Sequence, residues 1–508
     1  MRASSTPFIH IDPRQSEGLQ TQIYRAIRRA ILEGSLSSGA RLLSSRALAD
    51  DLRVSRTTTL LAYEQLIAEG YVTARHGSGT FVADTLPDDL QHANTPAERA
   101  SAIHPSVSKR GEALAALPPA AQRLSGPPRA FRIGVPALDR FPRRLWAQLV
   151  NRRLRRTTIA ELDYGDPAGQ WPLRQAIAVH VSAARGTHCT PEQVFIVAGA
   201  QRGLELVAQT LLEPGDRAVV EDPGYPGAWS AFARAQARLC PVAVDDEGID
   251  VLAIGRLRGR PRLAYVTPSH QFPLGVAMSL PRRLALLRWA RDADAWIVED
   301  DYDSEYRYSA RPIPCLHGLA SDGRVVYVGS FSKTLFPALR LGFLIVPEDV
   351  HARLASIRRA ADVHPPAFDQ LVVADLIAEG HYERHLRRTR AVCRERLEAL
   401  QDAVARQRKG ALRLRPVHAG LHAVADVADD VDMKRLASSA IAQGIELMPL
   451  SAYFTEPGVE PHAIVLGFGA VDVADIRKAV EKLARAILES RGAGASRRIG
   501  ARVKGGTS

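Results

Sequence analysis

The chain has 508 residues, of which 46% are hydrophobic, and it carries a formal charge of +12. This length is too great for one compact core and predicts two to four domains of roughly 150 residues each. No run of about 18 uncharged apolar residues occurs and the amino terminus has no apolar signal segment, so we expect a cytosolic protein with no membrane partner. The four cysteines lie far apart in no metal-ligand or redox spacing, which predicts a reducing compartment and no metal site.

Residues 16–83 predict one small, mainly helical unit. Apolar residues at helical spacing give a first helix that closes near Gly34. A second short helix covers residues 44–52, and after a three-residue break Ser55 is placed to cap a third helix. Two helices joined by such a turn form a helix-turn-helix, and the β-rich hairpin at 71–82 adds the wing of a winged helix.

The third helix opens with side chains suited to nucleic acid. Helix pairs with short turns also occur in cores that touch no DNA, but Arg56, Thr57 and Thr58 offer a cation and two hydroxyls where phosphates and bases would lie. The unit resembles the GntR-type winged helix, with Leu43 in place of the usual proline and Leu60 where some members carry arginine. The resemblance implies that the following residues face double-stranded DNA: Arg46, Ser55, Arg56, Thr57, Thr58, His76 and Gly77.

The rest of the chain divides into a linker, a large unit and a tail. Residues 84–129 contain several prolines and little periodicity, which predicts a linker. Residues 130–490 predict a larger unit that ends in a smaller α+β lobe after about residue 349, with a closing helix at 473–489. The Gly/Ser/Arg composition of residues 491–508 predicts a disordered basic tail.

In the larger unit, short apolar runs alternate with helical patterns. This alternation predicts a mostly parallel α/β sheet that binds ligands beyond the carboxyl ends of its strands. We expect strands at 194–198, 217–220, 263–267, 295–299, 325–329 and 342–346, and helices at 201–212 and 281–293.

Lys333, in the segment VGSFSKTLFPALRLG, is the only lysine between Lys109 and Lys409. Only 7 of the 67 basic residues are lysines, so most exchangeable lysines of this chain have become arginine. A desolvated lysine can lose its proton and attack a carbonyl group, which an arginine cannot do. The alternative is a chance survivor on a solvated loop.

Polar groups gather at the predicted strand ends. Gly199, Ala200 and Gln201 open a helix after the first strand, a geometry that holds phosphate. The other polar groups are Asp300 and Tyr302 after the fourth strand, and Ser330, Ser332, Lys333 and Arg340 after the fifth. Each alone also fits a turn, a helix cap or a core aromatic residue. Together they offer phosphate donors, an amine and a carboxylate, the set that pyridoxal 5′-phosphate (PLP) requires.

Four motifs carry a second resemblance. They are YGDPAG at 164–169, EDPGYP at 221–226, TPSHQFP at 267–273 and the lysine segment. Residues 131–489 resemble a fold-type I aminotransferase, and its union with a GntR-type winged helix resembles the MocR/GabR regulators. The resemblance implies that Lys333 forms a Schiff base with PLP, with the cofactor contacts spread over Ala200, Gln201, Tyr225, Asp300, Tyr302, Ser330, Ser332 and Arg340. In that mapping Asp300 meets the pyridine nitrogen, Tyr302 the ring hydroxyl and Tyr225 the ring face, while Ala200, Gln201, Ser330 and Arg340 hold the phosphate.

Two departures from the aminotransferase pattern separate the possible functions. Phe272 replaces the usual asparagine, and residues 463–468 lack the arginine that grips a substrate carboxylate, for which Arg311 is one candidate replacement. We therefore expect a homodimeric regulator that senses PLP, or an amine or amino-acid effector, without net turnover. A working aminotransferase with an attached DNA-binding domain is the alternative. A dimerisation domain that has lost its cofactor is the third possibility, and Lys333, Asp300, Tyr302 and Arg340 weigh against it.

Overall fold

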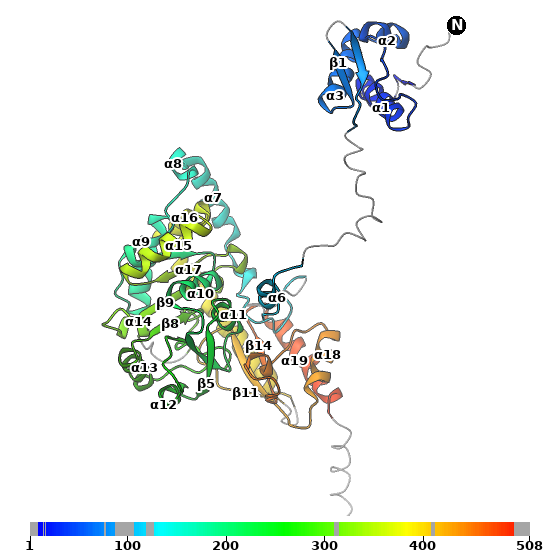
Figure 1. Ribbon diagram of the computed structural model, residues 1–508. Coiled ribbons are helices and arrows are strands. Elements are labelled where there is room, and N and C mark those ends of the chain that lie inside the picture. The colour runs from blue at the N-terminus through cyan, green and yellow to red at the C-terminus, as the bar shows by residue number, and fades with distance from the viewer. Residues whose placement is uncertain are drawn as a thin grey trace, which may run out of the picture. The chain divides into compact units, whose positions relative to one another are not determined.

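The computed structural model describes residues 9–13, 15, 17–75, 78–86, 106–117, 126–308, 314–407 and 412–491. The chain divides into two compact units, Met1–Ser108 and Lys109–Ser508 (Figure 1). Within these described ranges, no helix is both long enough and apolar enough to cross a membrane.

The first unit is a three-helix bundle with a hairpin. Its elements are α1 (Leu19–Leu32), α2 (Ser45–Leu52), α3 (Arg56–Ala68), β1 (Val72–Arg75) and β2 (Gly79–Val82). The two strands pair antiparallel, and the apolar stripe of α1, Ile23, Ile27 and Ile31, lies in the core. These bounds confirm the predicted helices and the predicted hairpin.

Hydroxyl caps fix the turn between α2 and α3. The side chain of Ser44 accepts a hydrogen bond from the Ala47 amide at 3.1 Å, and that of Ser55 accepts one from the Thr58 amide at 3.1 Å. Between them, Arg53 adopts a left-handed conformation with φ of 57° and ends α2. Each cap satisfies an amide that the helix itself leaves without an acceptor, so α3 begins at Arg56 as predicted.

The larger unit is built on an eight-stranded sheet in the order β3-β10-β9-β8-β7-β4-β5-β6. Its strands are β3 (Val194–Val197), β4 (Arg217–Asp222), β5 (Arg238–Asp245), β6 (Gly248–Ile249), β7 (Leu263–Val266), β8 (Trp296–Asp301), β9 (Val325–Ser330) and β10 (Gly342–Ile345). Strand β10 is antiparallel to both neighbours and β6 is antiparallel to β5, while the strands from β9 to β5 are parallel. The mostly parallel sheet is confirmed; β5 and β6 were not predicted.

Helices cover both faces of this sheet, and strands such as β3, β7 and β10 are buried along their whole length. One face packs on α10 (Ala200–Leu211), α11 (Pro226–Arg234) and α15 (Glu348–Ala361). The other packs on α12 (Val251–Gly255), α13 (Leu280–Asp292) and α14 (Leu316–Leu319), and near β3 and β10 on α7 (Arg143–Arg156), α9 (Trp171–Arg185) and α16 (Ala367–Ala378). Neighbouring residues alternate between the faces, as Tyr265 and Val266 do.

The smaller lobe follows the long helix α17 (His381–Ala405) and lies to the right of the sheet in Figure 1. It contains α18 (Met433–Ala442), α19 (Val473–Glu489) and the antiparallel strands β11 (Leu412–Leu414), β12 (His422–Val427), β14 (Ala463–Gly467) and β13 (Met448–Pro449), in that order across the sheet. Helix α19 has the predicted bounds.

The predicted linker and tail are only partly described. The linker contains a short helix, α6 (Lys109–Ala115), which its lack of periodicity did not predict. Residues 87–105, 118–125 and 492–508 lie outside the described ranges. Arg491, where the predicted tail begins, forms a β-bridge with Val431 and so belongs to the lobe.

Candidate functional site

The strand register brings three sequence-distant segments to one edge of the sheet. Gly342 pairs with Ser330 on one side and with Val197 on the other. Helix α10 starts three residues after Val197, so its amino terminus lies beside the carboxyl end of β9. The predicted residues Ala200, Gln201 and Ser330 therefore lie at the same edge of the sheet.

An anion cradle is formed where α10 begins. Gly199 has φ of 84° and ψ of 163°, and a Cβ at this position would lie 3.1 Å from Cζ, Nη1 and Nη2 of Arg340. Arg340 also donates to the carbonyl of Ala198 at 3.0 Å, which holds the guanidinium at the helix end. The first amides of a helix have no acceptor within it and carry a positive dipole charge, so this cradle suits a phosphate.

Four predicted residues near the cradle, Gln201, Ser330, Ser332 and Tyr225, make the following contacts. The Gln201 amide donates to the Gly227 carbonyl at 3.0 Å, while its Oε1 is buried with no partner in the described part of the chain. The Ser332 amide donates to Ser330 Oγ at 3.1 Å, which leaves the Ser330 hydroxyl proton available. Tyr225 precedes α11 and meets the edge of Phe272 with ring centroids 5.9 Å apart.

Lys333 lies in the loop that leaves β9, with its amine donating to the Gly134 carbonyl at 2.7 Å. Burial lowers the pKa of the amine, and the negative charges of Asp303 and Asp300 work in the opposite direction. A lysine whose charged form is penalised by desolvation releases its proton more easily and becomes a nucleophile.

Asp300, on β8, has a buried carboxylate oxygen that accepts no hydrogen bond from the described residues. Its Oδ2 accepts from the Tyr265 hydroxyl at 2.8 Å, whereas its Oδ1 is buried with no partner among the described residues. Burial raises the pKa of this carboxyl to about 7, against the hydrogen bond from Tyr265. Because buried polar atoms are nearly always paired, an unpaired carboxylate oxygen fits a donor supplied by a ligand.

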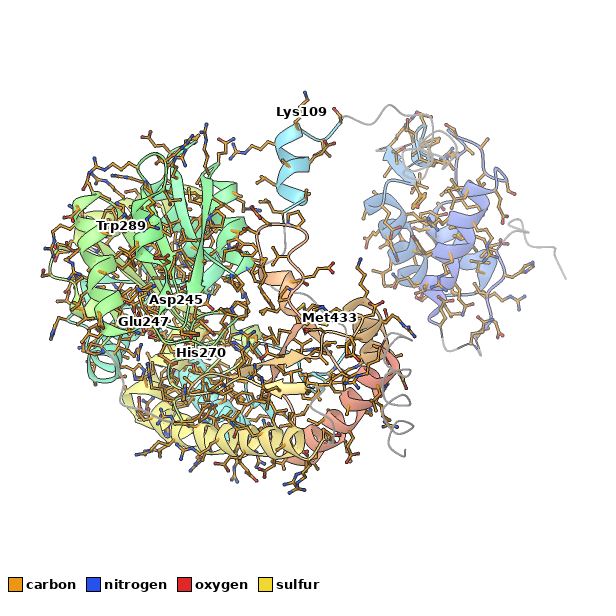
Figure 2. The ribbon with its side chains drawn as sticks, turned by 90° about the horizontal axis from the view of Figure 1, so that it is seen from below. Lys109, Asp245, Glu247, His270, Trp289 and Met433 are labelled. Atoms are coloured by element: carbon orange, nitrogen blue, oxygen red, sulfur yellow. The ribbon has the colours of Figure 1, made fainter. Side chains whose placement is uncertain are left out.

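A histidine network that the sequence did not predict lies close to Lys333. His270 Nδ1 lies 3.1 Å from both carboxylate oxygens of Asp303 and 3.0 Å from the Tyr302 hydroxyl. Figure 2 labels His270 inside the larger unit. His270, Asp303 and His422 are also close enough together to share a cation. His270 and Asp303 lie in two different loops and His422 begins β12, so no local spacing could have indicated them.

Another buried acid that the sequence did not single out is Glu221 at the end of β4. Its carboxylate accepts from the Thr267 hydroxyl at 2.6 Å and from the Gln271 amide at 3.3 Å. Burial raises its pKa to about 7. Both partners belong to the predicted TPSHQFP motif, so Glu221 holds that motif against the sheet.

The residues expected to grip a substrate carboxylate are apolar in this chain. Val465 on β14 is fully buried in a cluster with Val424, Leu450 and Tyr453, against which Phe272 packs. None of these side chains can form a charge-assisted bond with a carboxylate. The candidate replacement Arg311 lies outside the described residues.

The predicted DNA-facing residues gather around the amino ends of α2 and α3. Arg46, Ser55, Arg56 and Thr57 are exposed. Thr58 is half-buried, and its hydroxyl lies 2.7 Å from that of Ser55. His76 and Gly77 lie outside the described residues.

Two family models match this chain, one for each unit. Residues 19–82 match the gntR family of bacterial regulatory proteins, and residues 142–483 match aminotransferase class I and II. The chain is 39% identical to the probable rhizopine catabolism regulatory protein MocR of Rhizobium meliloti, over 94% of this chain and 95% of that protein. The chain belongs to this family of transcriptional regulators.

The regulator is also similar to a second transcriptional regulator and to the solved structure of an enzyme. It is 34% identical to the pyridoxine biosynthesis transcriptional regulator PdxR of Corynebacterium glutamicum, over 94% of this chain and 98% of that one. It is also similar to the solved structure of LysN, an alpha-aminoadipate aminotransferase of Thermus thermophilus complexed with N-(5′-phosphopyridoxyl)-L-leucine. That likeness has 28% identity and a TM-score of 0.66, and it covers 79% of the regulator and 98% of LysN.

Proposed function

We propose that this regulator binds double-stranded DNA through residues 16–83 and senses PLP, or an amine or amino acid that joins PLP, through residues 130–490. Residues 84–129 link the two. When bound, PLP supplies an aldehyde that takes up a primary amine and a ring that withdraws electrons from it. The gntR-family match supports the DNA partner, and the phosphopyridoxyl complex of LysN supports the cofactor class.

The residues at the strand ends fit PLP group by group. Lys333 would hold the aldehyde carbon, and Asp300 would accept a hydrogen bond from the ring nitrogen. Tyr225 would lie on the ring face and Tyr302 at the ring hydroxyl. The phosphate would lie in the cradle lined by Ala200, Gln201, Ser330, Ser332 and Arg340.

The unpaired Oδ1 of Asp300 is the observation that carries this proposal. A buried carboxyl with a pKa near 7 does not stabilise the fold, because the protein alone does not offset the cost of burying its ionised form. A protonated ring nitrogen is a cationic donor that would both pair the oxygen and lower this pKa. No other part of the cofactor would have that effect on Asp300.

The likeness to LysN favours a second candidate, an active aminotransferase attached to a DNA-binding unit. Turnover of amino acids requires a residue that binds their carboxylate, and residues 463–468, the region that would supply it, contain no arginine. Phe272 also stands where aminotransferases usually carry asparagine. These two positions favour a sensor over an enzyme.

The test combines cofactor absorption with DNA binding. Purified wild type, Lys333→Ala and the exposed control Lys478→Ala are titrated with PLP, and each is then bound to DNA from upstream of its own gene, with and without candidate amines. We expect wild type and Lys478→Ala to gain a visible band and to change operator affinity with the amine. Lys333→Ala should bind operator but lose both responses.

Other outcomes would contradict the sensor proposal or favour the aminotransferase. A wild type without a visible band, or a Lys333→Ala variant that keeps the band and the response, would overturn the sensor proposal. Transfer of amino groups to a keto acid faster than roughly 1 per second would favour the aminotransferase.

A further inference from the structure

One nitrogen atom of His270 has three polar neighbours. Its Nδ1 lies 3.1 Å from Oδ1 and Oδ2 of Asp303, and 3.0 Å from the hydroxyl of Tyr302. The side chains of His270 and Asp303 are each 2% exposed, so water has little access to the contact between them. A neutral imidazole nitrogen carries either a proton or a lone pair, never both. The network therefore has two arrangements.

In the first arrangement Nδ1 carries a proton and donates it to Asp303. The Tyr302 hydroxyl then has no acceptor at His270, and its own proton points elsewhere. In the second, Nδ1 accepts the proton of Tyr302, and the buried Asp303 carboxylate loses its donor. Leaving a buried carboxylate without a donor is far costlier than turning a hydroxyl, so the first arrangement is favoured.

The surroundings keep the ring in this place. Gly420 has φ of +81°, and a Cβ there would overlap the His270 ring and come within 2.6 Å of Asp303 Oδ2. A Cβ on Gly275 would lie 3.2 Å from His270 Nε2. His422 packs beside the ring at a centroid distance of 4.8 Å, and its own Nε2 donates to the Pro273 carbonyl at 3.0 Å. Backbone on two sides and a ring on the third leave His270 no other position.

We propose that His270 is a positioning residue: held by Asp303, it keeps the Tyr302 hydroxyl free to donate a hydrogen bond to the cofactor attached at Lys333. This inference rests on the proposed function. A hydrogen bond from the Tyr302 hydroxyl would stabilise negative charge on the ring oxygen of PLP. That oxygen would then stabilise a protonated nitrogen at Lys333 less strongly, so the pKa of this nitrogen would be lower. His270 thereby helps to set the pH at which the bound cofactor changes its protonation.

The pKa shifts of Tyr302 and His422 support Tyr302 as the hydrogen-bond donor. Burial, followed by the charge of Asp303, raises the pKa of Tyr302 well above its usual range, so its hydroxyl keeps the proton that it donates. Burial lowers the pKa of His422 well below its usual range, so that neighbour contributes no charge. The remaining charged or titratable groups that act on Tyr302, Asp303 or Lys333 are Asp300, Asp301, Glu221, Glu305, Tyr306, Arg307 and Tyr308.

The test uses the two amides that mimic the two ring nitrogens. In asparagine the amide nitrogen is as far from Cβ as Nδ1 is in histidine, whereas in glutamine it corresponds to Nε2. His270→Asn therefore keeps a donor toward Asp303, and His270→Gln removes it. The matched control is His180→Gln, because His180 Nδ1 also binds a carboxylate, that of Glu383, at 2.8 Å.

Each PLP-loaded protein is titrated with acid and base while the visible spectrum is recorded. We expect the midpoint of the spectral change to rise by about one pH unit in His270→Gln and in Tyr302→Phe, and to stay near wild type in His270→Asn and His180→Gln. The double variant His270→Gln/Tyr302→Phe should shift no further than the larger single shift, because His270 acts through Tyr302.

Three results would overturn the inference. They are an unchanged midpoint in His270→Gln beside a shifted one in Tyr302→Phe, shifts that add in the double variant, and His270→Asn shifting as far as His270→Gln. A divalent metal that survives chelation in wild type but not in His270→Gln would also overturn it, in favour of a cation held by His270, Asp303 and His422. Failure of the proposed function is distinguishable, because wild type would then show no visible band to titrate.

Discussion

The guanidinium group of Arg340 lies against the backbone of Gly199, in space that exists only because Gly199 has no side chain. A Cβ on Gly199 would lie 3.1 Å from three atoms of the guanidinium. Gly199 has φ of 84° and ψ of 163°, a conformation open almost only to glycine, and Arg340 itself has a left-handed backbone with φ of 49°. Two unfavourable backbone conformations thus bring one cation to the amino end of α10.

Gly199→Ala should weaken PLP binding at least about tenfold, a loss of about 1.4 kcal/mol. The added methyl group displaces Arg340 from the phosphate cradle and strains the backbone. Gly444→Ala is the matched control, because Gly444 also has a positive φ, of +73°, but no atom within 4 Å of an added Cβ. Titration of each protein with PLP measures the effect. Equal affinities for the two variants would contradict a phosphate site at Arg340.

Asp300→Asn should stabilise the PLP-free protein at pH 8 and weaken its hold on PLP. Burial raises the pKa of Asp300 from 3.8 to about 7, so the folded state binds the proton more tightly than the unfolded chain does. The stability that this group contributes therefore falls as the pH rises from about 4 to 7, and asparagine removes that loss.

Thermal unfolding measures this effect. Without PLP, we expect the Tm of Asp300→Asn to exceed that of wild type by about 2 °C or more at pH 8 and by little at pH 4. Saturating PLP should abolish the difference, because the ring nitrogen then compensates the wild-type carboxylate. The exposed Asp246→Asn is the control. A gain that persists unchanged with PLP would separate Asp300 from the cofactor.

The sequence predicts those parts of the fold that depend on local pattern. The caps of α3, the closing helix α19 and six strands follow from periodicity and turn residues, with small errors at their ends. Strand β5 escaped prediction because it contains Pro241, which normally marks a break. The structure tolerates it because β6 pairs only with Val244 and Asp245, so Pro241 faces an open edge.

The candidate site likewise contains residues that the local sequence pattern predicts and contacts that it does not. Asp300 lies at the end of β8, and Lys333 and Arg340 lie in the segment between β9 and β10, so their position at the strand ends could be predicted from the strand pattern. The contact between His270 and Asp303 joins residues 33 apart, and Gly420, from the smaller lobe, closes over both. Such a contact depends on how the two parts of the larger unit pack, which no local pattern records.

The regulator should be a homodimer that buries the exposed apolar side chains of α7 and α8 (Ile159–Leu162). Figure 1 shows α8 at the tip of the larger unit. Ile159 is 89% exposed, Leu162 76% and Tyr164 81%, although a capping box of Thr158 and Glu161 holds α8 in place. Ordered apolar side chains exposed together mark an interaction surface, and a second copy is the partner that a two-half-site operator requires.

Ile159→Asp/Leu162→Asp should therefore shift the protein from dimer to monomer at micromolar concentration in sedimentation experiments. The control is Leu252→Asp, which alters an equally exposed leucine, 74% exposed, on α12. A wild type that sediments as a monomer in the presence of PLP would contradict this prediction, and so would a double variant that remains dimeric.

Arg56→Ala should weaken operator binding roughly tenfold while leaving the fold and PLP absorption unchanged. Arg56 is the first residue of α3, is exposed, and is held at the helix end by the Ser55 cap. A phosphate contact releases a counterion, so its loss should also reduce the slope of log affinity against log salt by about 0.9 per site. A base contact would instead lower affinity for the operator more than for unrelated DNA. Arg29→Ala, an exposed arginine on α1, is the control. If Arg56→Ala bound operator as wild type does at every salt concentration, α3 would not be the helix that meets DNA.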